Sequence, residues 1–250
     1  MKISIITATY NSEKTIKDTW DSVLNQTYAD FEHIIIDGDS KDKTMEIVKE
    51  YEPKYNGRLK YISERDGGIY DAMNKGIKIA TGDIIGILNS DDIYAHNNVL
   101  EEIAKRFKET NCDGTYANLI FMDEETMTKP KRVWRSKEGK LENGWHPAHP
   151  TLYLKKDVYN KIGLFNLNYR IVADYDFMIR MLKDKDIRLS YINDTIVYMR
   201  IGGTSTAGLK GYYRNLKESH KALVANKVPH PYYIDFRRIM RTIFQMCKKR

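Results

Sequence analysis

A short apolar run that ends abruptly in polar and acidic residues constrains this chain more than any other stretch. Residues 84–88 are almost wholly apolar, which is typical of a strand buried on both faces of a parallel sheet. Asn89, Ser90, Asp91 and Asp92 follow at once. Two adjacent carboxylates repel each other, and burying either without a partner is costly. We therefore expect them at an open strand end, beside a cation or hydrogen-bond donors.

The side chains at this strand end favour a hard divalent cation. Mg2+ and Mn2+ take oxygen ligands and often share phosphate oxygens, so Asp91 and Asp92 are candidate metal ligands. The alternative is a solvated turn that caps the next helix. The segments before it favour a binding site.

Three earlier strands are predicted to end in the same way. Residues 3–7, 31–36 and 59–62 are predicted strands, and a helical pattern follows each of them, with Ser12 as the expected N-cap of the first helix. Alternating strands and helices predict a parallel sheet, whose ligands bind beyond the carboxyl ends of the strands. The polar residues expected at that edge are Thr9, Tyr10, Asn11, Asp37, Asp39, Glu64, Arg65, Asp66, Asn89, Asp91 and Asp92.

Several protein classes are disfavoured. The first strand is followed by neither a glycine-rich dinucleotide motif nor a P-loop, and Lys41 breaks the calcium-loop pattern that begins at Asp37. The net charge is +7, of which +5 lies in residues 232–250, so the body is no obvious nucleic-acid binder. Two distant cysteines and no long apolar run indicate a cytoplasmic protein that does not span a membrane.

The second half is predicted to contain further strands at 115–122, 131–135, 187–191 and 195–199. A helix is expected to open at Asp174, where acids in the first turn are commonplace, so that a structural role for Asp174 stays open. His146 and His149 lie in a loop rich in rings, where hydrogen-bonding or substrate contacts are more frequent than metal ligation. Residues 202–206 are rich in glycine and hydroxyl side chains, which predicts a loop that includes Gly203 and Ser205.

Four motifs in order resemble the family 2 glycosyltransferases. They cover the first hundred residues densely, and the match continues more thinly through residues 149–151 and 173–176. The motifs are Ser4-Ile5-Ile6-Thr7-Ala8-Thr9-Tyr10-Asn11, Asp37-Gly38-Asp39-Ser40-Lys41-Asp42, Asp66-Gly67-Gly68-Ile69-Tyr70-Asp71-Ala72-Met73-Asn74-Lys75-Gly76 and Leu88-Asn89-Ser90-Asp91-Asp92.

The resemblance implies an α/β protein with the GT-A fold, a Rossmann-like, mostly parallel twisted sheet flanked by helices. Residues 1–110 would bind the nucleotide sugar, residues 111–207 would bind the acceptor and supply the base, and residues 208–250 would form a helical region with a basic amphipathic tail. By the same similarity Asp174 is the catalytic base, and Asp91 and Asp92 hold Mn2+ or Mg2+ at the donor diphosphate. The implied donor-binding residues are Ala8, Tyr10, Asp37, Asp39, Asp66, Asn74, Lys75, Asn89 and Ser90; the acceptor and loop candidates are His149, Asp176, Gly203 and Ser205.

One departure from the family pattern matters. Asn89 stands where the first acid of the Asp-x-Asp motif is expected, so the metal role rests on Asp91 and Asp92. The Gln-x-x-Arg-Trp motif of the processive synthases is also absent. The resemblance thus predicts an inverting transfer of one sugar from a nucleotide-diphosphate sugar to a hydroxyl of a glycan or lipid-linked acceptor, in the biosynthesis of surface polysaccharide such as lipopolysaccharide. A sugar-phosphate nucleotidyltransferase and an inactive nucleotide-sugar-binding protein are the alternatives.

The C-terminal tail has its own pattern. Apolar residues of 232–250 recur near helical spacing with cations between them, which is typical of a helix lying on an anionic membrane. A helix packed on the domain with solvated charges is the equal alternative. Peripheral attachment to the inner face of the cytoplasmic membrane is therefore one hypothesis for this tail.

Overall fold

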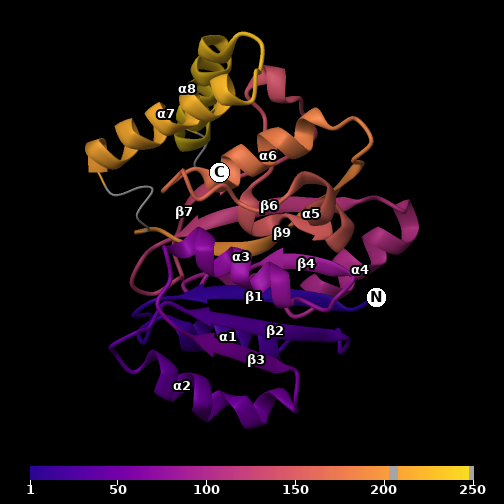
Figure 1. Ribbon diagram of the computed structural model, residues 1–250, viewed down its shortest axis with the longest axis vertical. Helices are drawn as coiled ribbons and strands as arrows, with labels where there is room; N and C mark the ends of the chain where they lie inside the picture. The colour runs from indigo at the N-terminus through magenta and orange to yellow at the C-terminus, as the bar shows by residue number, and fades with distance from the viewer. Residues whose placement is uncertain (203–207, 248–250) are drawn as a thin grey trace.

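Alternating strands and helices build the first half of the chain, as predicted (Figure 1). The structure is a computed structural model that describes residues 1–202 and 208–247, so Gly203 and Ser205 lie outside the described residues. Four parallel strands follow the spatial order β3-β2-β1-β4. They are β1 (Ile3–Thr9), β2 (Phe31–Asp37), β3 (Leu59–Ser63) and β4 (Ile84–Ile87), and the helices between them are α1 (Ile16–Leu24), α2 (Thr44–Tyr51) and α3 (Ile69–Ile79).

The second half continues the same sheet in mixed orientation, giving the order β3-β2-β1-β4-β8-β6-β9-β5 with β7 paired to β6. β8 is antiparallel to both β4 and β6, whereas β6 and β9 run parallel. The strands are β5 (Ile93–Tyr94), β6 (Gly114–Met122), β7 (Pro130–Trp134), β8 (Tyr153–Lys155) and β9 (Leu189–Arg200).

The two strands predicted at 187–191 and 195–199 form one strand, β9. Its pairing with β6 passes from Tyr116 opposite Tyr191 to Asn118 opposite Thr195. A bulge therefore takes up the polar residues between Tyr191 and Thr195 without ending the strand. Polarity at these positions is why the sequence suggested a break.

Both faces of the sheet are covered, which explains why its central strands β1, β2 and β4 are largely apolar and fully buried. Ile6 and Ile34 belong to a core cluster that also contains buried residues of α3, α6 and α7. Ile5 and Ile35 belong to a second cluster with α1, α2 and α4 on the other face. The remaining helices are α4 (Val99–Thr110), α5 (Lys156–Ile162), α6 (Ala173–Lys183), α7 (Gly208–Ala225) and α8 (Pro231–Cys247), with the 3-10 turns η1 (Glu52–Tyr55), η2 (Leu141–Asn143) and η3 (His149–Thr151).

A glycine lets α3 approach the centre of the sheet. A Cβ added at Gly76 would lie 2.5 Å from Cγ2 of Ile6, closer than side chains tolerate. The absence of a side chain therefore fixes the spacing between α3 and β1. That spacing also fixes where Tyr70, in the first turn of α3, is held.

The C-terminal helices α7 and α8 lie together beside α6, at the end of the molecule away from β3 (Figure 1). His220 of α7 meets Asp235 of α8 with Nδ1 and Oδ2 2.6 Å apart, and Ile234 is buried between the elements. Arg238 and Arg241 are partly buried and line a cavity, whereas the side of α8 with Tyr233 and Phe236 is exposed. The tail pattern predicted cations around the apolar side of this helix, but these two arginines face the cavity instead.

No helix among residues 1–202 and 208–247 combines the length and apolarity needed to cross a bilayer.

Candidate active site

The end of β4 places its acidic pair in unequal surroundings. Asp92 is fully buried: its Oδ2 accepts a hydrogen bond from Nδ2 of Asn89 at 3.1 Å and its Oδ1 one from the backbone N–H of Arg200 at 3.2 Å. Burial and the neighbouring charge of Asp91 raise the pKa of Asp92 well above its ordinary value. Asp92 thus ties β4 to β9, and its oxygens already have partners.

Asp91 is the member of the pair left for a ligand. Burial raises the pKa of its carboxyl, an effect that the charge of Arg200 opposes. Beside it, Oδ1 of Asn89 is buried and has no hydrogen-bond partner within the described part of the chain. A desolvated carboxylate and an orphaned amide oxygen are both hard oxygen donors, so these residues fit a divalent cation of the Mg2+ or Mn2+ type.

Arg200, at the end of β9, is a residue of this site that sequence reasoning missed. Its side chain is about nine-tenths buried and forms an ion pair with Asp18 (Nη2–Oδ2 3.0 Å), while Nε lies 3.4 Å from the carbonyl oxygen of Asp91. A third hydrogen bond goes to the carbonyl of Glu124. No local pattern could have indicated this role, because the partners lie 76 to 182 residues away.

The end of β2 carries a buried carboxylate that organises its neighbours. Asp37 accepts hydrogen bonds from the hydroxyls of Thr9 (3.0 Å) and Ser63 (2.7 Å) and from both the backbone and the hydroxyl of Ser40. Strands β1, β2 and β3 are therefore fixed to one another at their carboxyl ends by this residue. With four donors already satisfied, the Asp37 carboxylate shapes the edge and has little capacity for a further partner.

The other predicted donor residues of this edge lie around Asp37. Asp39 has a positive φ of 66° and its carboxylate pairs with Lys41 at 2.7 Å. Asp66 reaches over Gly38, where an added Cβ would be 2.8 Å from its Oδ2, so a side chain at this position would displace the Asp66 carboxylate. Ala8 is buried and Tyr10 is 64% exposed, which leaves the ring of Tyr10 open to solvent at the rim.

Ser12 and Ser90 connect the first and fourth strand ends. Their hydroxyls lie 2.9 Å apart, and the hydroxyl of Thr15 donates to the carbonyl of Ser90 at 2.8 Å. Helix α1 begins at Ile16 with Thr15 in the N-cap position, so the prediction of Ser12 as the N-cap is wrong. The hydroxyl of Ser12 is used across the site instead.

Asn74 and Lys75 are engaged with the protein itself. The amide of Asn74 is buried and exchanges two hydrogen bonds of 2.9 Å with the backbone of Phe165. Lys75 forms ion pairs with Glu64 at 2.7 Å and Asp71 at 3.7 Å. Asn74 thus joins α3 to the loop before α6, and its amide is not free to contact the nucleotide-sugar donor.

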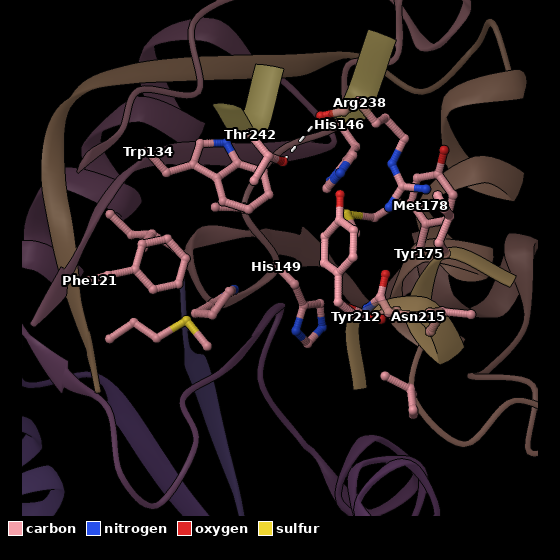
Figure 2. A pocket seen from close by; sticks show the side chains of 18 of the residues that line it. Phe121, Trp134, His146, His149, Tyr175, Met178, Tyr212, Asn215, Arg238 and Thr242 are labelled. Carbon is pink, nitrogen blue, oxygen red and sulfur yellow. Dashed lines mark hydrogen bonds between the residues drawn. The ribbon is translucent and has the colours of Figure 1, made fainter. Parts of the chain in front are cut away.

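A cavity of about 450 Å³ lies between the sheet and the C-terminal helices. Figure 2 shows Phe121 and Trp134 on one side of it, with Tyr175 and Arg238 on the other. Both Asn89, from the end of β4, and Asp174, from the first turn of α6, belong to its wall. Asn89, a predicted donor-binding residue next to the predicted metal ligands, and the predicted base Asp174 therefore face a common space.

Asp174 is held by a tyrosine from α3. The hydroxyl of Tyr70 lies 2.9 Å from Oδ1 of Asp174 and 2.7 Å from the carbonyl oxygen of Ile171. Burial and the charge of Asp174 raise the pKa of Tyr70 well above its ordinary value, so the hydroxyl stays protonated as a donor. Because Tyr70 fixes one oxygen, the other oxygen of Asp174 is left for a partner in the cavity.

His149, a predicted acceptor contact, lies in the same cavity wall as Asp174. Burial lowers the pKa of His149, and the charge of Asp174 only partly opposes this. His146 contacts the rings of Trp134 and Tyr175 at centroid distances of 5.2 and 5.1 Å. Two neutral imidazoles thus contribute polar edges to a largely aromatic surface.

Asp176 does not reach the cavity. It is buried, with Oδ2 paired to Nε of Arg180 at 3.0 Å and Oδ1 accepting from Asn226 at 2.8 Å. Two residues apart on a helix point about 200° apart, so Asp174 and Asp176 face different surroundings. Asp176 therefore joins α6 to the end of α7, and it does not line the cavity as a predicted acceptor contact would.

A family model described as "Glycosyl transferase family 2" matches residues 4–184. The chain belongs to family 2 of the glycosyltransferases. A relative from Mycobacterium bovis (strain BCG / Pasteur 1173P2), named "PGL/p-HBAD biosynthesis glycosyltransferase", is 30% identical over 206 residues, which are 81% of this chain and 78% of the relative. Like its relatives, the chain is a glycosyltransferase enzyme.

Solved structures confirm the predicted GT-A architecture for this family member. Residues 1–349 of S. aureus TarS in complex with UDP-GlcNAc align with a TM-score of 0.72 at 22% identity, over 98% of this chain and 73% of that one. The chain spans 44% of the longer TarS chain. A mannosyltransferase from Pyrobaculum calidifontis in complex with GDP-Man and Mn2+ aligns with a TM-score of 0.67 at 17% identity, over 94% and 68%.

Proposed function

We propose that this glycosyltransferase moves one sugar, with inversion, from a nucleotide-diphosphate sugar to an acceptor hydroxyl, in the biosynthesis of a surface glycan or glycolipid. The observation that carries the proposal is the shared cavity wall of Asn89 and Asp174. A donor held at the strand ends and an acceptor held in the cavity would meet there. The neighbours in complex with UDP-GlcNAc or GDP-Man support the donor class.

Asp174 is the proposed base. Its carboxylate takes the proton of the acceptor hydroxyl as the hydroxyl oxygen bonds to the anomeric carbon, and the bond from that carbon to the donor phosphate breaks. The nucleoside diphosphate leaves with the bonding electrons. A single displacement inverts the configuration and needs no enzyme nucleophile, while Tyr70 holds the carboxylate in position through the 2.9 Å contact.

Asp91, supported by the orphaned oxygen of Asn89, is the proposed holder of Mn2+ or Mg2+. A bound cation neutralises the diphosphate, both on binding and as negative charge develops on the leaving group. Asp92 is proposed to orient Asn89 through their 3.1 Å hydrogen bond. The nucleotide is proposed to lie along the β1–β2–β3 edge, against Ala8, Tyr10, Asp37, Asp39 and Asp66, with Ser90 beside the phosphates.

Two measurements test this function. Thermal shift with UDP, GDP and dTDP, each with and without Mn2+, identifies the donor base, because a ligand of the folded state raises the melting temperature. Donor consumption with and without a membrane lipid extract then reports transfer. If no nucleotide stabilises the protein in a Mn2+-dependent way, the donor assignment is wrong.

The exposed aromatic side of α7 and α8 is the proposed contact with an anionic membrane surface. Tyr213, Tyr232, Phe236 and Phe244 are between 58% and 78% exposed. Tyrosine and phenylalanine rings favour the interface between lipid and water, and Arg237, which is exposed next to Phe236 on α8, adds a cation. We expect Phe236→Ser combined with Phe244→Ser to reduce sedimentation with anionic liposomes, whereas Leu167→Ser, an exposed apolar residue outside these helices, does not. Equal sedimentation of the wild type, the double variant and Leu167→Ser would contradict the proposal.

A further inference from the structure

The wall of the cavity carries an excess of guanidinium groups. Arg132 comes from β7, Arg170 from the loop before α6, and Arg238 and Arg241 from α8. Among the described lining residues, Asp174 is the one carboxylate. Four cations and one anion around a partly enclosed space leave that space strongly positive.

The guanidinium of Arg132 lines the cavity without a carboxylate partner from the described part of the chain. Its guanidinium carbon lies 3.8 Å from the ring centroid of Phe121 and 6.0 Å from that of Trp134. It forms no ion pair with any residue of the described chain. Burial lowers the pKa of Arg132 to about 10, because a guanidinium without a counterion is poorly solvated there. An anion in the cavity would relieve that cost.

The α8 arginines are only partly neutralised. Nη1 of Arg241 donates to the carbonyl of Gly144 at 3.3 Å, and burial lowers its pKa. Arg238 lies over the Tyr175 ring at 3.8 Å and 3.7 Å from Asp235, whose other oxygen is taken by His220. One carboxylate therefore serves two partners, and the positive charge toward the cavity persists.

His146 reports the same field. Its pKa falls to about 3, first because of burial and then because of the charges of Arg238 and Arg241. The imidazole is neutral at any working pH and adds no charge of its own. The positive charges that disfavour a proton on His146 would favour an anion in the same cavity.

From this arrangement, and resting on the function proposed above, we propose that the cavity binds a phosphate group of the acceptor, held by Arg132, Arg238 and Arg241 while the reacting hydroxyl faces Asp174. Guanidinium groups bind phosphate through paired N–H donors, and their stacking on aromatic rings orients them before the ligand arrives. Trp134, which is partly exposed in the same wall, offers an apolar ring to the part of the acceptor next to the phosphate. The acceptor class is thus a phosphate-bearing glycan or lipid.

The binding test uses inorganic phosphate as the probe, measured by calorimetry at constant ionic strength. The measurement is made on the Asp91→Asn variant, in which the proposed metal site is disabled. Phosphate that would bind through a divalent cation at that site then does not contribute to the measured affinity. In this background we expect Arg132→Gln and Arg241→Gln each to lower phosphate affinity by on the order of 10-fold, as for loss of a charge-assisted contact. Arg237→Gln, on the exposed side of α8, is the matched control and should change little.

A second measurement assigns the arginines to acceptor or donor. With Asp91 restored, the same variants are titrated with the cognate nucleoside diphosphate and Mn2+, and unchanged affinity is expected. A loss there would place the arginines at the donor diphosphate and overturn the proposal. Unchanged phosphate affinity in both variants, or tighter binding of glucuronate than of phosphate, would overturn it as well.

The two proposals fail separately. If Asp174→Asn keeps its transfer activity, the proposed base is wrong while the phosphate result stands. Conversely, a protein that does not bind phosphate can still lose transfer through Asp174→Asn. Circular dichroism and the melting temperature of each variant show whether it is folded, and Arg132→Lys, which keeps the charge but loses the paired donors, is expected to recover part of the affinity.

Discussion

Replacing Asp174 with asparagine removes the proposed base while nearly preserving its shape. The amide can still meet the Tyr70 hydroxyl at the 2.9 Å position and can still lie in the first turn of α6. A positioned general base contributes about 10²–10⁴-fold, so we expect kcat to fall by that factor with nucleotide affinity unchanged.

Tyr70→Phe tests the positioning of the same carboxylate. The variant removes one hydrogen bond to a charged oxygen, worth about 1.5–3 kcal/mol, which corresponds to roughly 10–100-fold in rate if the contact persists in the transition state. If Tyr70 acts only by orienting Asp174, the double variant should be no slower than Asp174→Asn alone.

The assay follows release of nucleoside diphosphate at saturating donor and varied acceptor, with calorimetry for donor affinity. Near-normal turnover of Asp174→Asn would refute the reasoning, because no other described carboxylate lines the cavity. Losses that add fully in the double variant would show that Tyr70 acts independently. A variant that no longer unfolds cooperatively would instead support a structural role for Asp174.

Three further perturbations follow from the contacts. Asp91→Asn should lower the Mn2+-dependent affinity for a nucleoside diphosphate by at least ~10-fold. Asp92→Asn should lower it by less, because the Asp92 carboxylate already accepts hydrogen bonds from the protein. Calorimetry with Mn2+ or EDTA measures both affinities, and equal losses would contradict the distinction. Asn74→Ala leaves the buried N–H of Phe165 unpaired, so urea unfolding should show a loss of about 1–3 kcal/mol with nucleotide affinity unchanged. His33 is buried and its pKa falls to about 3, from 6.5 ordinarily, so the unfolded chain binds a proton that the folded chain does not. The free energy of unfolding should then fall by up to about 1.4 kcal/mol per unit as the pH drops from 6.5 to about 3, and His33→Gln should lose that slope.

The first half of the fold was predictable because its signals are local. The apolar runs of β1, β2 and β4 require cover on both faces, and their polar ends therefore meet at one edge. The three-residue strand β8 was missed, since three residues hold no period and its place between β4 and β6 depends on distant pairing. The continuity of β9 was hidden by its bulge.

The site residues also differ in whether local sequence or distant packing determines their role. Asp37 and Asp91 were marked by their place after buried strands, which adjacent sequence shows. The contrast between Asp174 and Asp176 follows from helical phase, but which of the two faces the cavity depends on the packing of α6 against α7. Arg132 and Arg241 carried no signal, because a guanidinium in a β strand or a basic tail is ordinarily solvated.

The position of α8 has a consequence for how new specificity arises in such enzymes. The family match ends at residue 184, whereas Arg238, Arg241 and Thr242 of the cavity wall come from later in the chain. On the proposed phosphate site, some acceptor contacts therefore come from α8, outside the stretch that the family model matches, whereas Arg132 lies inside it. On this proposal, exchanging the C-terminal helices between relatives changes the acceptor while the donor is kept, and changes in the tail diversify the products that are made from one activated sugar.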